Sequence, residues 1–387
     1  MNTIKRCVHI AISEHRAFFL FGPRKVGKTT YLKAQFPDAK YYDLLDTRLQ
    51  ARFLRTPYLL REEVLAEKFK IVIIDEVQKV PALLDEVHWC LENTDTRFIL
   101  CGSSARKLRH GAINLLGGRA WHEDMFPLTS AEISDIDLLR ALNHGTIPQH
   151  YESAHPTRFL EGYVLDYIQQ EIQAEAQVRQ VPIFSRFLEV VAVTNGELIN
   201  YENMARECGV SAKTIREYYQ ILEDTLLGYR LPPWKKRKQK PLIESSKFYL
   251  FDTGLTRALR DMIVIQPKTH EFGKAFEHLM VNEIRAYLAY THTHKKLSFW
   301  RTRTHEEIDL IVGDMDCAIE FKAKDHVLKE DTKAFDRLFQ EWSPKKSIVV
   351  SLDETKRLLS NHVLVMPWRL FLSDLWAGNI VGSMNDT

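Results

Sequence analysis

A glycine-rich segment near the N-terminus constrains this chain more than any other feature. Residues 22–29 read GPRKVGKT and fit the spacing GxxxxGK[ST]. The apolar run Ala17–Phe21 before the segment suits a short buried strand, and Thr30–Gln35 after it suits the start of a helix. Glycines in such a loop let successive backbone N–H groups turn inward, where they bind phosphate oxygens. The segment therefore predicts a phosphate-binding loop between a strand and a helix.

The positions in this loop have predicted parts in nucleotide binding. Lys28 supplies a positive charge for the β- and γ-phosphates, and the Thr29 hydroxyl suits a bound Mg²⁺. The loop residues that we expect to surround the nucleotide are Gly22, Pro23, Arg24, Lys25, Val26, Gly27, Lys28, Thr29 and Thr30.

A second predicted strand carries the acidic residues that ATP hydrolysis needs. The run Ile71–Ile74 ends in Asp75 and Glu76. Asp75 suits the Mg²⁺ shell, and Glu76 suits a residue that orients or deprotonates a water. A glycine-rich turn and a capped strand would explain either motif alone. Both motifs in this order, each at a strand end, predict an ATPase with ATP and Mg²⁺ as cofactors.

Strand-like and helix-like segments alternate through the first part of the chain, which predicts a parallel sheet with helices on both faces. Two more expected strands are Lys40–Leu44 and Arg97–Cys101. The expected helices include Thr47–Leu54, Tyr58–Glu67 and Ala82–Leu91.

Two further positions are candidates for a part in hydrolysis. Ser103 or Ser104, after the strand Arg97–Cys101, suits a polar residue that reaches the γ-phosphate or the attacking water, although serine at a strand end commonly caps a helix. Arg119 is a candidate charge-stabilising arginine that acts within its own chain or across a subunit boundary of a homo-oligomer. A surface turn with a solvated arginine is the alternative.

Beyond Pro148 the pattern changes to longer amphipathic helices and then to a helix-turn-helix. In this motif Ala205 is small enough for a close helix crossing, Gly209 makes the turn and Ser211 caps the second helix. The residues expected to face inward are Val210, Ile215 and Leu222.

Two strand-like segments, Leu226–Leu231 and Phe248–Phe251, follow and flank a basic turn, which is typical of a winged helix. Contacts with DNA phosphates would give salt-sensitive, sequence-independent affinity. The alternative is a winged helix that only packs within the protein, with a solvated basic loop. The residues expected to face DNA are Lys213, Arg216 and Tyr218 on the second helix, and Lys235, Lys236, Arg237 and Lys238 on the turn.

Three predicted elements beyond residue 253 carry charged residues among apolar ones. Because strand side chains alternate, two charges separated by one residue share a face. Burying such charges is unfavourable unless they are paired or bound to a metal. The elements are the helix Phe272–Leu288 with Glu277, the strand Glu307–Val312 with Asp309, and the strand Cys317–Lys322 with Glu320 and Lys322.

This spacing reproduces the PD-(D/E)xK nuclease arrangement. Asp309 and Glu320 suit Mg²⁺ together with the carbonyl of Phe321, and Glu277 suits a contact through a metal-bound water. Lys322 suits a residue that positions or deprotonates the attacking water. A structural ion pair between Lys322 and either Glu320 or Asp309 is the alternative.

Composition excludes several other classes. A length of 387 residues favours two or three domains, and 45% hydrophobic with 27% charged residues is typical of a soluble globular protein. With a net charge of +2, any nucleic-acid surface is local. No apolar stretch approaches the roughly 20 residues of a membrane span. Five scattered cysteines without a CxxC pair favour a reducing compartment, so we expect a cytoplasmic protein with no membrane contact.

Short segments in a fixed order span nearly the whole chain. They are GPRKVGKTT, IDEVQKVP, CGSSARKL, GGRA, FPLTSAEI, KFYLFDTGL, GKAFEHL, EIDLIV and IEFKAK. On these segments the chain resembles the prokaryotic AAA-like ATP-binding proteins that end in a domain of unknown function with a restriction-endonuclease-like core. Unlike a typical AAA+ ring motor, it shows no small helical lid with its own sensor arginine after Pro127.

The resemblance implies an α/β protein of three domains. These are a P-loop NTPase domain with a parallel sheet (residues 1–147), a helical and winged-helix domain (148–252) and a restriction-endonuclease-like α/β domain (253–387). We therefore expect an ATP-binding protein and ATPase that engages DNA, with Mg²⁺-dependent DNA cleavage by the tail as the sharper hypothesis. The alternative is a nucleotide-switched regulator or scaffold whose tail binds a partner without cutting.

Overall fold

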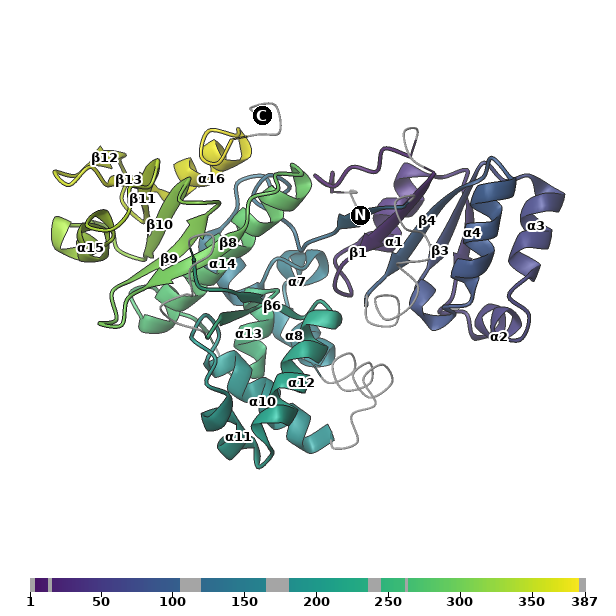
Figure 1. Cartoon of the computed structure of the whole chain (residues 1–387), viewed down its shortest axis with the longest axis horizontal. Helices are drawn as coiled ribbons and strands as arrows, with labels where there is room; N and C mark the ends of the chain where they lie inside the picture. The colour runs from purple at the N-terminus through teal and green to yellow at the C-terminus, as the bar shows by residue number, and fades with distance from the viewer. Residues whose placement is uncertain are drawn as a thin grey trace. The chain divides into compact units, whose positions relative to one another are not determined.

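The computed structural model describes residues 4–12, 16–104, 120–164, 181–235, 245–261 and 264–382. The chain divides into two compact units. The first consists of residues 1–128 and 221–227, and the second of residues 129–220 and 228–387. Figure 1 labels the helices and strands of both units and colours them from purple at the N-terminus to yellow at the C-terminus. The finer division into three domains stays a prediction.

The first unit contains a five-stranded parallel sheet of order β2-β3-β4-β1-β5, of which Figure 1 labels β1, β3 and β4. This confirms the predicted parallel sheet, and the first four strands lie close to their predicted positions. The sequence does not predict β5, because its residues AWHED are mostly polar. The strands are β1 (Ala17–Phe21), β2 (Lys40–Asp43), β3 (Ile71–Asp75), β4 (Arg97–Gly102) and β5 (Ala120–Asp124).

Strand β1 lies between β4 and β5 and is apolar throughout. All five of its residues are buried, as expected for a parallel strand covered on both faces. Its register pairs Ala17 with Phe98 and Phe21 with Gly102 of β4. Because all strands of this sheet are parallel, their C-terminal ends meet at one edge.

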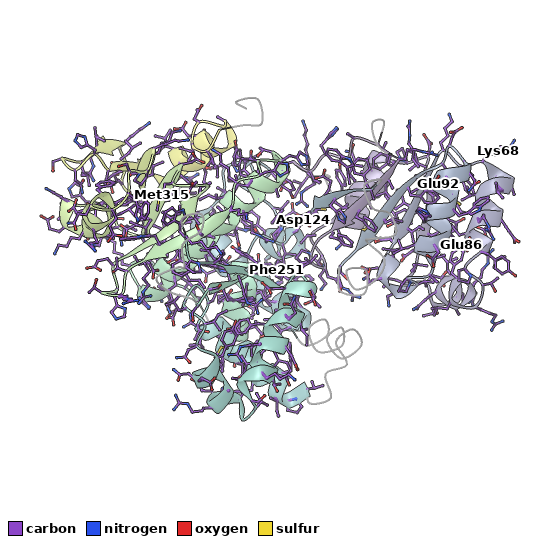
Figure 2. The ribbon with its side chains drawn as sticks, in the orientation of Figure 1. Lys68, Glu86, Glu92, Asp124, Phe251 and Met315 are labelled. Carbon is purple, nitrogen blue, oxygen red and sulfur yellow. The ribbon has the colours of Figure 1, made fainter. Side chains whose placement is uncertain are left out.

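Helices connect these strands, as the alternating pattern predicts. Helix α4 shows why they form: its buried side carries leucines and a valine, whereas Glu92 lies on its exposed side (Figure 2). This amphipathic spacing buries one face of the helix against the sheet. The helices are α1 (Lys28–Gln35), α2 (Thr47–Arg55), α3 (Leu59–Glu67), the 3₁₀ helix η1 (Val77–Lys79) and α4 (Leu83–Asn93).

The second unit begins with short helices. Asp252 fixes two of their ends, since its carboxylate accepts hydrogen bonds from the backbone N–H of Thr146 (2.7 Å) and of Leu255 (3.0 Å). Residues Ile221–Asp224 at the end of α12 group with the first unit. The helices are α6 (Leu138–His144), α7 (Pro148–Glu152), α8 (Pro156–Gly162), α10 (Val181–Val193), α11 (Tyr201–Cys208), α12 (Ala212–Asp224) and α13 (Thr253–Leu259).

Helices α11 and α12 are joined by the turn that the sequence predicts. Asn200 caps the start of α11, and Gly209 ends it in the left-handed region at φ 67°. The Ser211 hydroxyl accepts a hydrogen bond from the N–H of Thr214 (3.1 Å) at the start of α12. An antiparallel pair follows, β6 (Gly228–Leu231) with β7 (Lys247–Leu250). The winged-helix assignment stays a prediction.

A six-stranded mixed sheet of order β12-β13-β11-β10-β9-β8 forms the C-terminal part. The neighbours β10–β11 and β11–β13 are parallel and the other pairs antiparallel. Strands β8, β9 and β10 have the predicted bounds, whereas the restriction-endonuclease-like assignment stays a prediction. The strands are β8 (Leu297–Arg301), β9 (Glu307–Val312), β10 (Cys317–Lys322), β11 (Lys346–Ser351), β12 (Arg357–Leu358) and β13 (Leu364–Pro367).

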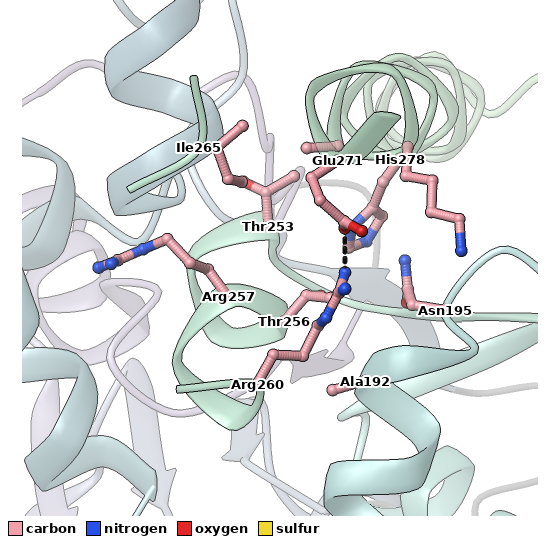
Figure 3. Close-up of a pocket in the computed structure, with 11 residues that line it drawn as sticks. Ala192, Asn195, Thr253, Thr256, Arg257, Arg260, Ile265, Glu271 and His278 are labelled. Carbon is pink, nitrogen blue, oxygen red and sulfur yellow. Dashed lines mark hydrogen bonds and ion pairs between the residues drawn. The ribbon is translucent and has the colours of Figure 1, made fainter. Parts of the chain in front are cut away.

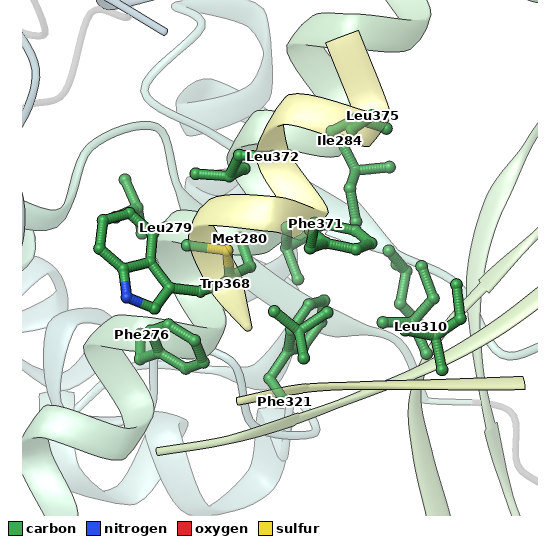
Figure 4. Packing of buried hydrophobic residues seen from close by; sticks show 14 of the residues in the cluster. Phe276, Leu279, Met280, Ile284, Leu310, Phe321, Trp368, Phe371, Leu372 and Leu375 are labelled. Atoms are coloured by element: carbon green, nitrogen blue, oxygen red, sulfur yellow. The ribbon is translucent and has the colours of Figure 1, made fainter. Parts of the chain in front are cut away.

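Helices cover both faces of this sheet. On one face, α14 (His270–Tyr290) and α16 (Trp368–Trp376) pack Phe276 and Phe371 against Phe321 of β10 (Figure 4). On the other face lies α15 (Lys333–Phe339), which follows the 3₁₀ helix η3 (Lys329–Thr332) and buries its apolar residues against β9 and β11.

Among the helices that the structure describes, none has the length and apolar content needed to pass through a bilayer. The five cysteines all belong to the described residues and are free thiols, and four of them are buried. The cytoplasmic location stays a prediction.

Candidate functional site

The two predicted nucleotide motifs come together at one edge of the first sheet. The glycine-rich loop follows β1, Asp75 ends β3 with Glu76 directly after it, and Ser103 follows β4. Strand β4 pairs with both β1 and β3, so the C-terminal ends of the three strands are adjacent. Ligands of open parallel sheets bind at this kind of edge.

Two glycines allow the loop its course. A Cβ atom on Gly22 would lie 2.3 Å from the carbonyl oxygen of Met125, so a side chain there requires the backbone to move. Gly27 takes a left-handed conformation at φ 99° and precedes Lys28, the first residue of α1. The N-cap residue of α1 is Gly27, which has no side chain to bond the first N–H groups, so these groups are available to an anion.

Lys28 is buried inside the loop. Its ammonium donates hydrogen bonds to the carbonyl oxygens of Gly22 (2.7 Å) and Pro23 (2.9 Å). No described carboxylate forms an ion pair with it. The positive charge is thus held by neutral dipoles, which leaves it available to phosphate oxygens.

Thr29 and Asp75 meet as the two predicted Mg²⁺ ligands. The Thr29 hydroxyl donates to Asp75 Oδ2 at 2.6 Å, and the Tyr41 hydroxyl from β2 donates to the same oxygen. Burial and then the Asp75 charge raise the pKa of Tyr41, so that hydroxyl stays protonated. Hydroxyl and carboxylate oxygens are the hard ligands that Mg²⁺ prefers, so the pair fits this ion. The sequence analysis did not identify Tyr41.

Glu76 lies in a buried polar group with Gln78 and Ser103. Its Oε2 accepts hydrogen bonds from the Ser103 hydroxyl (3.0 Å) and from the side-chain amide of Gln78. Of the two candidate serines, Ser103 is thus the one beside Glu76, whereas Ser104 donates to the carbonyl of Asp224 (3.4 Å). The sequence analysis quoted Gln78 within IDEVQKVP but gave it no role.

The remaining loop residues differ in exposure. Lys25 and Thr30 are exposed, and Arg24 is half-buried. Val26 is buried, and its carbonyl accepts a hydrogen bond of 2.5 Å from Arg6, which also donates to the carbonyl of Phe126. Arg6 therefore ties the loop to the segment after β5, a contact that no sequence motif predicts. Arg119 lies outside the described residues.

In the second unit, Asp309, Glu320 and Lys322 come together as predicted. A β-bulge occurs at Asp309: β8 advances two residues, from Ser298 to Trp300, while its partner β9 advances three. Asp309 Oδ2 accepts a hydrogen bond of 2.9 Å from the N–H of Phe321. Glu320 Oε1 lies 3.6 Å from the Lys322 ammonium, on the shared face of β10.

Glu277 has hydrogen-bonding and charged partners on β7, and its predicted part in the metal site, through a metal-bound water, stays a prediction. Its carboxylate accepts a hydrogen bond of 2.6 Å from the Tyr249 hydroxyl and lies 3.5 Å from the ammonium of Lys247. Lys247, from β7, also pairs with Glu307 at 2.5 Å. Within the described part of the chain, no three His, Cys, Asp or Glu side chains are grouped to hold a metal ion.

Charge and burial shift the protonation of this cluster. Burial, and then neighbouring carboxylates, raise the pKa of Asp309 and of Glu320 above their ordinary range, and Lys322 opposes both shifts. Burial alone would lower the pKa of Lys247, but Glu277 and other carboxylates together hold it above its ordinary value. Glu320 Oε2 is buried and has no hydrogen-bond partner among the described residues.

Of the predicted DNA-contacting residues that the structure describes, some are exposed and one is buried. Lys213 and Lys235 are exposed, and so is Arg216, whose guanidinium stacks 4.8 Å from the ring centre of Tyr201. Tyr218 was wrongly predicted to face outward, since it is 8% exposed and packs on two phenylalanines of α10. Lys236, Arg237 and Lys238 lie outside the described residues.

A small polar pocket lies between α13 and α14 (Figure 3). Two of its three cations form ion pairs, Arg260 with Glu271 and Lys274 with Glu197, and the third, Arg257, donates a hydrogen bond of 2.7 Å to the backbone carbonyl of Asn143. The His278 imidazole is bonded to a backbone carbonyl, and burial lowers its pKa to about 4, so it is neutral at pH 7.

Three family models match consecutive parts of the chain. A model described as an AAA domain matches residues 14–134. Two domains of unknown function follow, DUF8612 over residues 136–264 and DUF4143 over residues 272–371. The predicted order of a P-loop domain followed by a C-terminal domain of unknown function is confirmed.

The chain is also similar to curated proteins that are themselves uncharacterized. One from Mycobacterium tuberculosis is 26% identical over 310 residues, which cover 77% of this chain and 68% of the relative. One from Methanocaldococcus jannaschii is 22% identical, and the match covers 94% of this chain and 86% of the relative. Among solved structures, the Aeropyrum pernix ORC1 protein in complex with DNA matches at 11% identity, with a TM-score of 0.25 over 63% of this chain and 86% of that chain. A score this low supports no argument about function. The chain thus joins an AAA domain of the nucleotide-binding P-loop type to two domains of unknown function.

Proposed function

We propose that the first unit binds ATP with Mg²⁺ and hydrolyses it. The observation that carries this proposal is the 2.6 Å contact between Thr29 Oγ1 and Asp75 Oδ2. It brings the hydroxyl of the glycine-rich loop and the carboxylate of the second motif to one point. The AAA domain match over the same residues supports the proposal.

Each residue at this edge has a part in the proposed reaction. Lys28 and the N–H groups at the start of α1 hold the β- and γ-phosphates. Thr29 and Asp75 hold Mg²⁺, which neutralises negative charge on the phosphates. Tyr41 orients Asp75 from the neighbouring strand. Glu76 accepts a proton from the attacking water, and Ser103 fixes its carboxylate.

The variant Glu76→Gln tests this proposal. It keeps the shape of the side chain but removes the base, so phosphate release should fall roughly 10²- to 10⁴-fold while ATP affinity stays within about threefold. Glu67→Gln is the matched control, because Glu67 is exposed at the end of α3. Equal rates of phosphate release by Glu76→Gln and wild type would remove Glu76 from this role.

We also propose that the second unit contacts DNA in an ATP-dependent way through α12 and the turn after β6. Lys213, Arg216 and Lys235 supply exposed positive charge, and Lys236, Arg237 and Lys238 continue the basic run. Anisotropy of a labelled duplex, measured over a salt series, should show weaker binding and a shallower slope for Lys213→Gln. Binding by Lys213→Gln and by Lys235→Gln that matches wild type at every salt concentration would contradict this contact.

A second candidate function is metal-dependent phosphodiester cleavage in the second unit. The observation in its favour is Glu320 Oε2, a buried carboxylate oxygen with no hydrogen-bond partner among the described residues, beside Asp309 and Lys322. We propose Asp309, Glu320 and the Phe321 carbonyl as metal ligands, with Lys322 positioning the water. Cleavage of DNA with Mn²⁺ by wild type, but not by Asp309→Asn, would support it. If both proteins leave DNA intact, the nucleotide-switched regulator becomes the better proposal.

A further inference from the structure

Gln78 is a buried polar residue in the proposed ATPase site to which no motif assigns a role. It lies in η1, two residues after Glu76, and is only 1% exposed. A polar side chain that is this deeply buried needs hydrogen-bond partners for both its donor and its acceptor atoms. The partners of its amide therefore indicate what the residue does.

The amide nitrogen of Gln78 is fully engaged. It donates one hydrogen bond to Glu76 Oε2 and a second, of 3.3 Å, to the Ser103 hydroxyl. Because an ionised carboxylate only accepts hydrogen bonds, the nitrogen must face Glu76, which fixes the orientation of the amide. Gln78 and Ser103 together occupy Glu76 Oε2. The other carboxylate oxygen, Oε1, forms no hydrogen bond with a described residue.

The amide oxygen of Gln78 is buried without a hydrogen-bond partner among the described residues. It lies against Gly102 at the end of β4, where an added Cβ would approach it to 2.5 Å. Gly102 in turn accepts a hydrogen bond from Gly22, the first residue of the glycine-rich loop. The amide oxygen, for which the described residues supply no donor, thus lies against the end of β4 that is bonded to the first residue of the glycine-rich loop.

We propose that Gln78 binds the attacking water: its amide nitrogen holds Glu76 in place, and its amide oxygen accepts a hydrogen bond from that water. This inference rests on the proposed ATPase function. The water loses one proton to Glu76 Oε1, and its oxygen forms a bond to the γ-phosphorus. The bond from that phosphorus to the β–γ bridging oxygen breaks, and ADP and phosphate leave.

The variant Gln78→Met is the first test, because methionine has a similar length but neither donor nor acceptor. We expect kcat for ATP hydrolysis to fall roughly 10- to 100-fold, with ATP affinity within about threefold of wild type. Gln35→Met is the control, since Gln35 is exposed on α1 of the same unit. A wild-type kcat, or weaker ATP binding with unchanged kcat, would overturn the proposal.

The variant Gly102→Ala gives a second test that leaves Gln78 itself in place. Gly102 is a strand residue without a positive φ, and among the described residues the nearest atom to the added methyl is the amide oxygen of Gln78, at 2.5 Å. The methyl should displace the amide oxygen and lower kcat about tenfold with ATP affinity kept. An unchanged kcat would contradict the inference even if Gln78→Met fails to fold.

A double variant separates action through Glu76 from general damage. If Gln78 acts on the water that Glu76 deprotonates, Glu76→Gln with Gln78→Met should be within about threefold of Glu76→Gln alone. If the fold-decreases in kcat of the two single variants multiply in the double variant, Gln78 acts independently of Glu76. If wild type itself neither binds nor hydrolyses ATP, the proposed function fails as a whole, which is a distinct result from a change confined to these variants.

Discussion

Two buried lysines, one in each unit, have opposite electrostatic surroundings. Lys28 of the first unit donates to two backbone carbonyls, at 2.7 and 2.9 Å, and has no carboxylate partner among the described residues. Lys247 of the second unit pairs with Glu307 at 2.5 Å and with Glu277 at 3.5 Å. Both side chains are nearly inaccessible to solvent.

The different partners of Lys28 and Lys247 distinguish a ligand site from a structural ion pair. A buried ammonium held only by neutral dipoles has charge left for an incoming anion. A buried ammonium between carboxylates is already neutralised, and its removal leaves those carboxylates uncompensated. Lys28 should therefore contribute mainly to binding, and Lys247 mainly to stability.

The largest expected effect is the destabilisation caused by Lys247→Met. Losing the cation should reduce the free energy of unfolding by about 3 kcal/mol, near the low end for buried pairs. The low end applies because Glu277 and Glu307 keep 22% and 20% of their side-chain exposure. Denaturant unfolding measures the change, with Lys235→Met as an exposed control. A loss below about 1 kcal/mol would mean that these carboxylates are solvated well enough without Lys247.

The next largest effect is the loss of ATP binding in Lys28→Met. We expect affinity to fall about 100-fold, or about 2.7 kcal/mol, because the ammonium bonds charged phosphates. The free energy of unfolding should change by less than about 1 kcal/mol, since Lys28 forms no ion pair with a described residue. Calorimetric titration and denaturant unfolding measure the two quantities. If Lys28→Met destabilised the protein as much as Lys247→Met does, the proposed difference between the two lysines would be contradicted.

A third effect concerns Glu283, a buried acid of the second unit that forms no ion pair with a described residue. Burial raises its pKa from 4.5 to about 7, although the Trp376 indole and Ser130 donate hydrogen bonds to it. Because the folded state then binds more protons than the unfolded state between these values, stability should fall by about 2 kcal/mol as pH rises from 4.5 to 7.

The control for this pH effect is Glu283→Gln, which does not titrate. Other buried acids with raised pKa values contribute to the wild-type slope, so the difference between the two slopes isolates Glu283. Unfolding free energies measured at several pH values supply both slopes. If the unfolding free energies of wild type and Glu283→Gln change equally with pH, Glu283 ionises as readily in the folded protein as in the unfolded chain.

The smallest effect is expected for Lys322→Met, in the same cluster as Lys247. Lys322 keeps 32% of its side-chain exposure and lies 3.6 Å from Glu320, so the pair should contribute less than about 1 kcal/mol. Measuring the loss of unfolding free energy for Lys322→Met and Lys247→Met in the same experiment compares a partly solvated cation with a buried one. A loss as large as that of Lys247→Met would contradict this expectation.

The sequence predicts those parts of the fold that depend on local apolar pattern. Strands β1, β8, β9 and β10 have the predicted bounds because most of their side chains are apolar, although β8, β9 and β10 also carry charged residues. Tyr218 was mispredicted although the helical spacing already places it with Ile215 on the buried side of α12.

The site residues that the sequence does not reveal depend on contacts between separate segments. Tyr41 reaches Asp75 from a neighbouring strand, and Lys247 reaches Glu307 from a hairpin far away in sequence. Tyr41 lies in no quoted segment, and the pairing of β2 with β3 brings it to Asp75. Lys247 begins the quoted segment KFYLFDTGL, but its partner Glu307 belongs to a different sheet, so tertiary packing brings the two together. Gln78 was within a quoted motif, but its link to Ser103 depends on the adjacent ends of β3 and β4.

Calorimetric titration of the protein with ATP, with and without Mg²⁺, tests the central claim most directly. We expect wild type to bind one ATP per chain, with higher affinity when Mg²⁺ is present. In Thr29→Val, which removes only the hydroxyl bonded to Asp75, Mg²⁺ should no longer raise the affinity for ATP. Failure of wild type to bind ATP, or an equal Mg²⁺ effect in Thr29→Val, would contradict this claim.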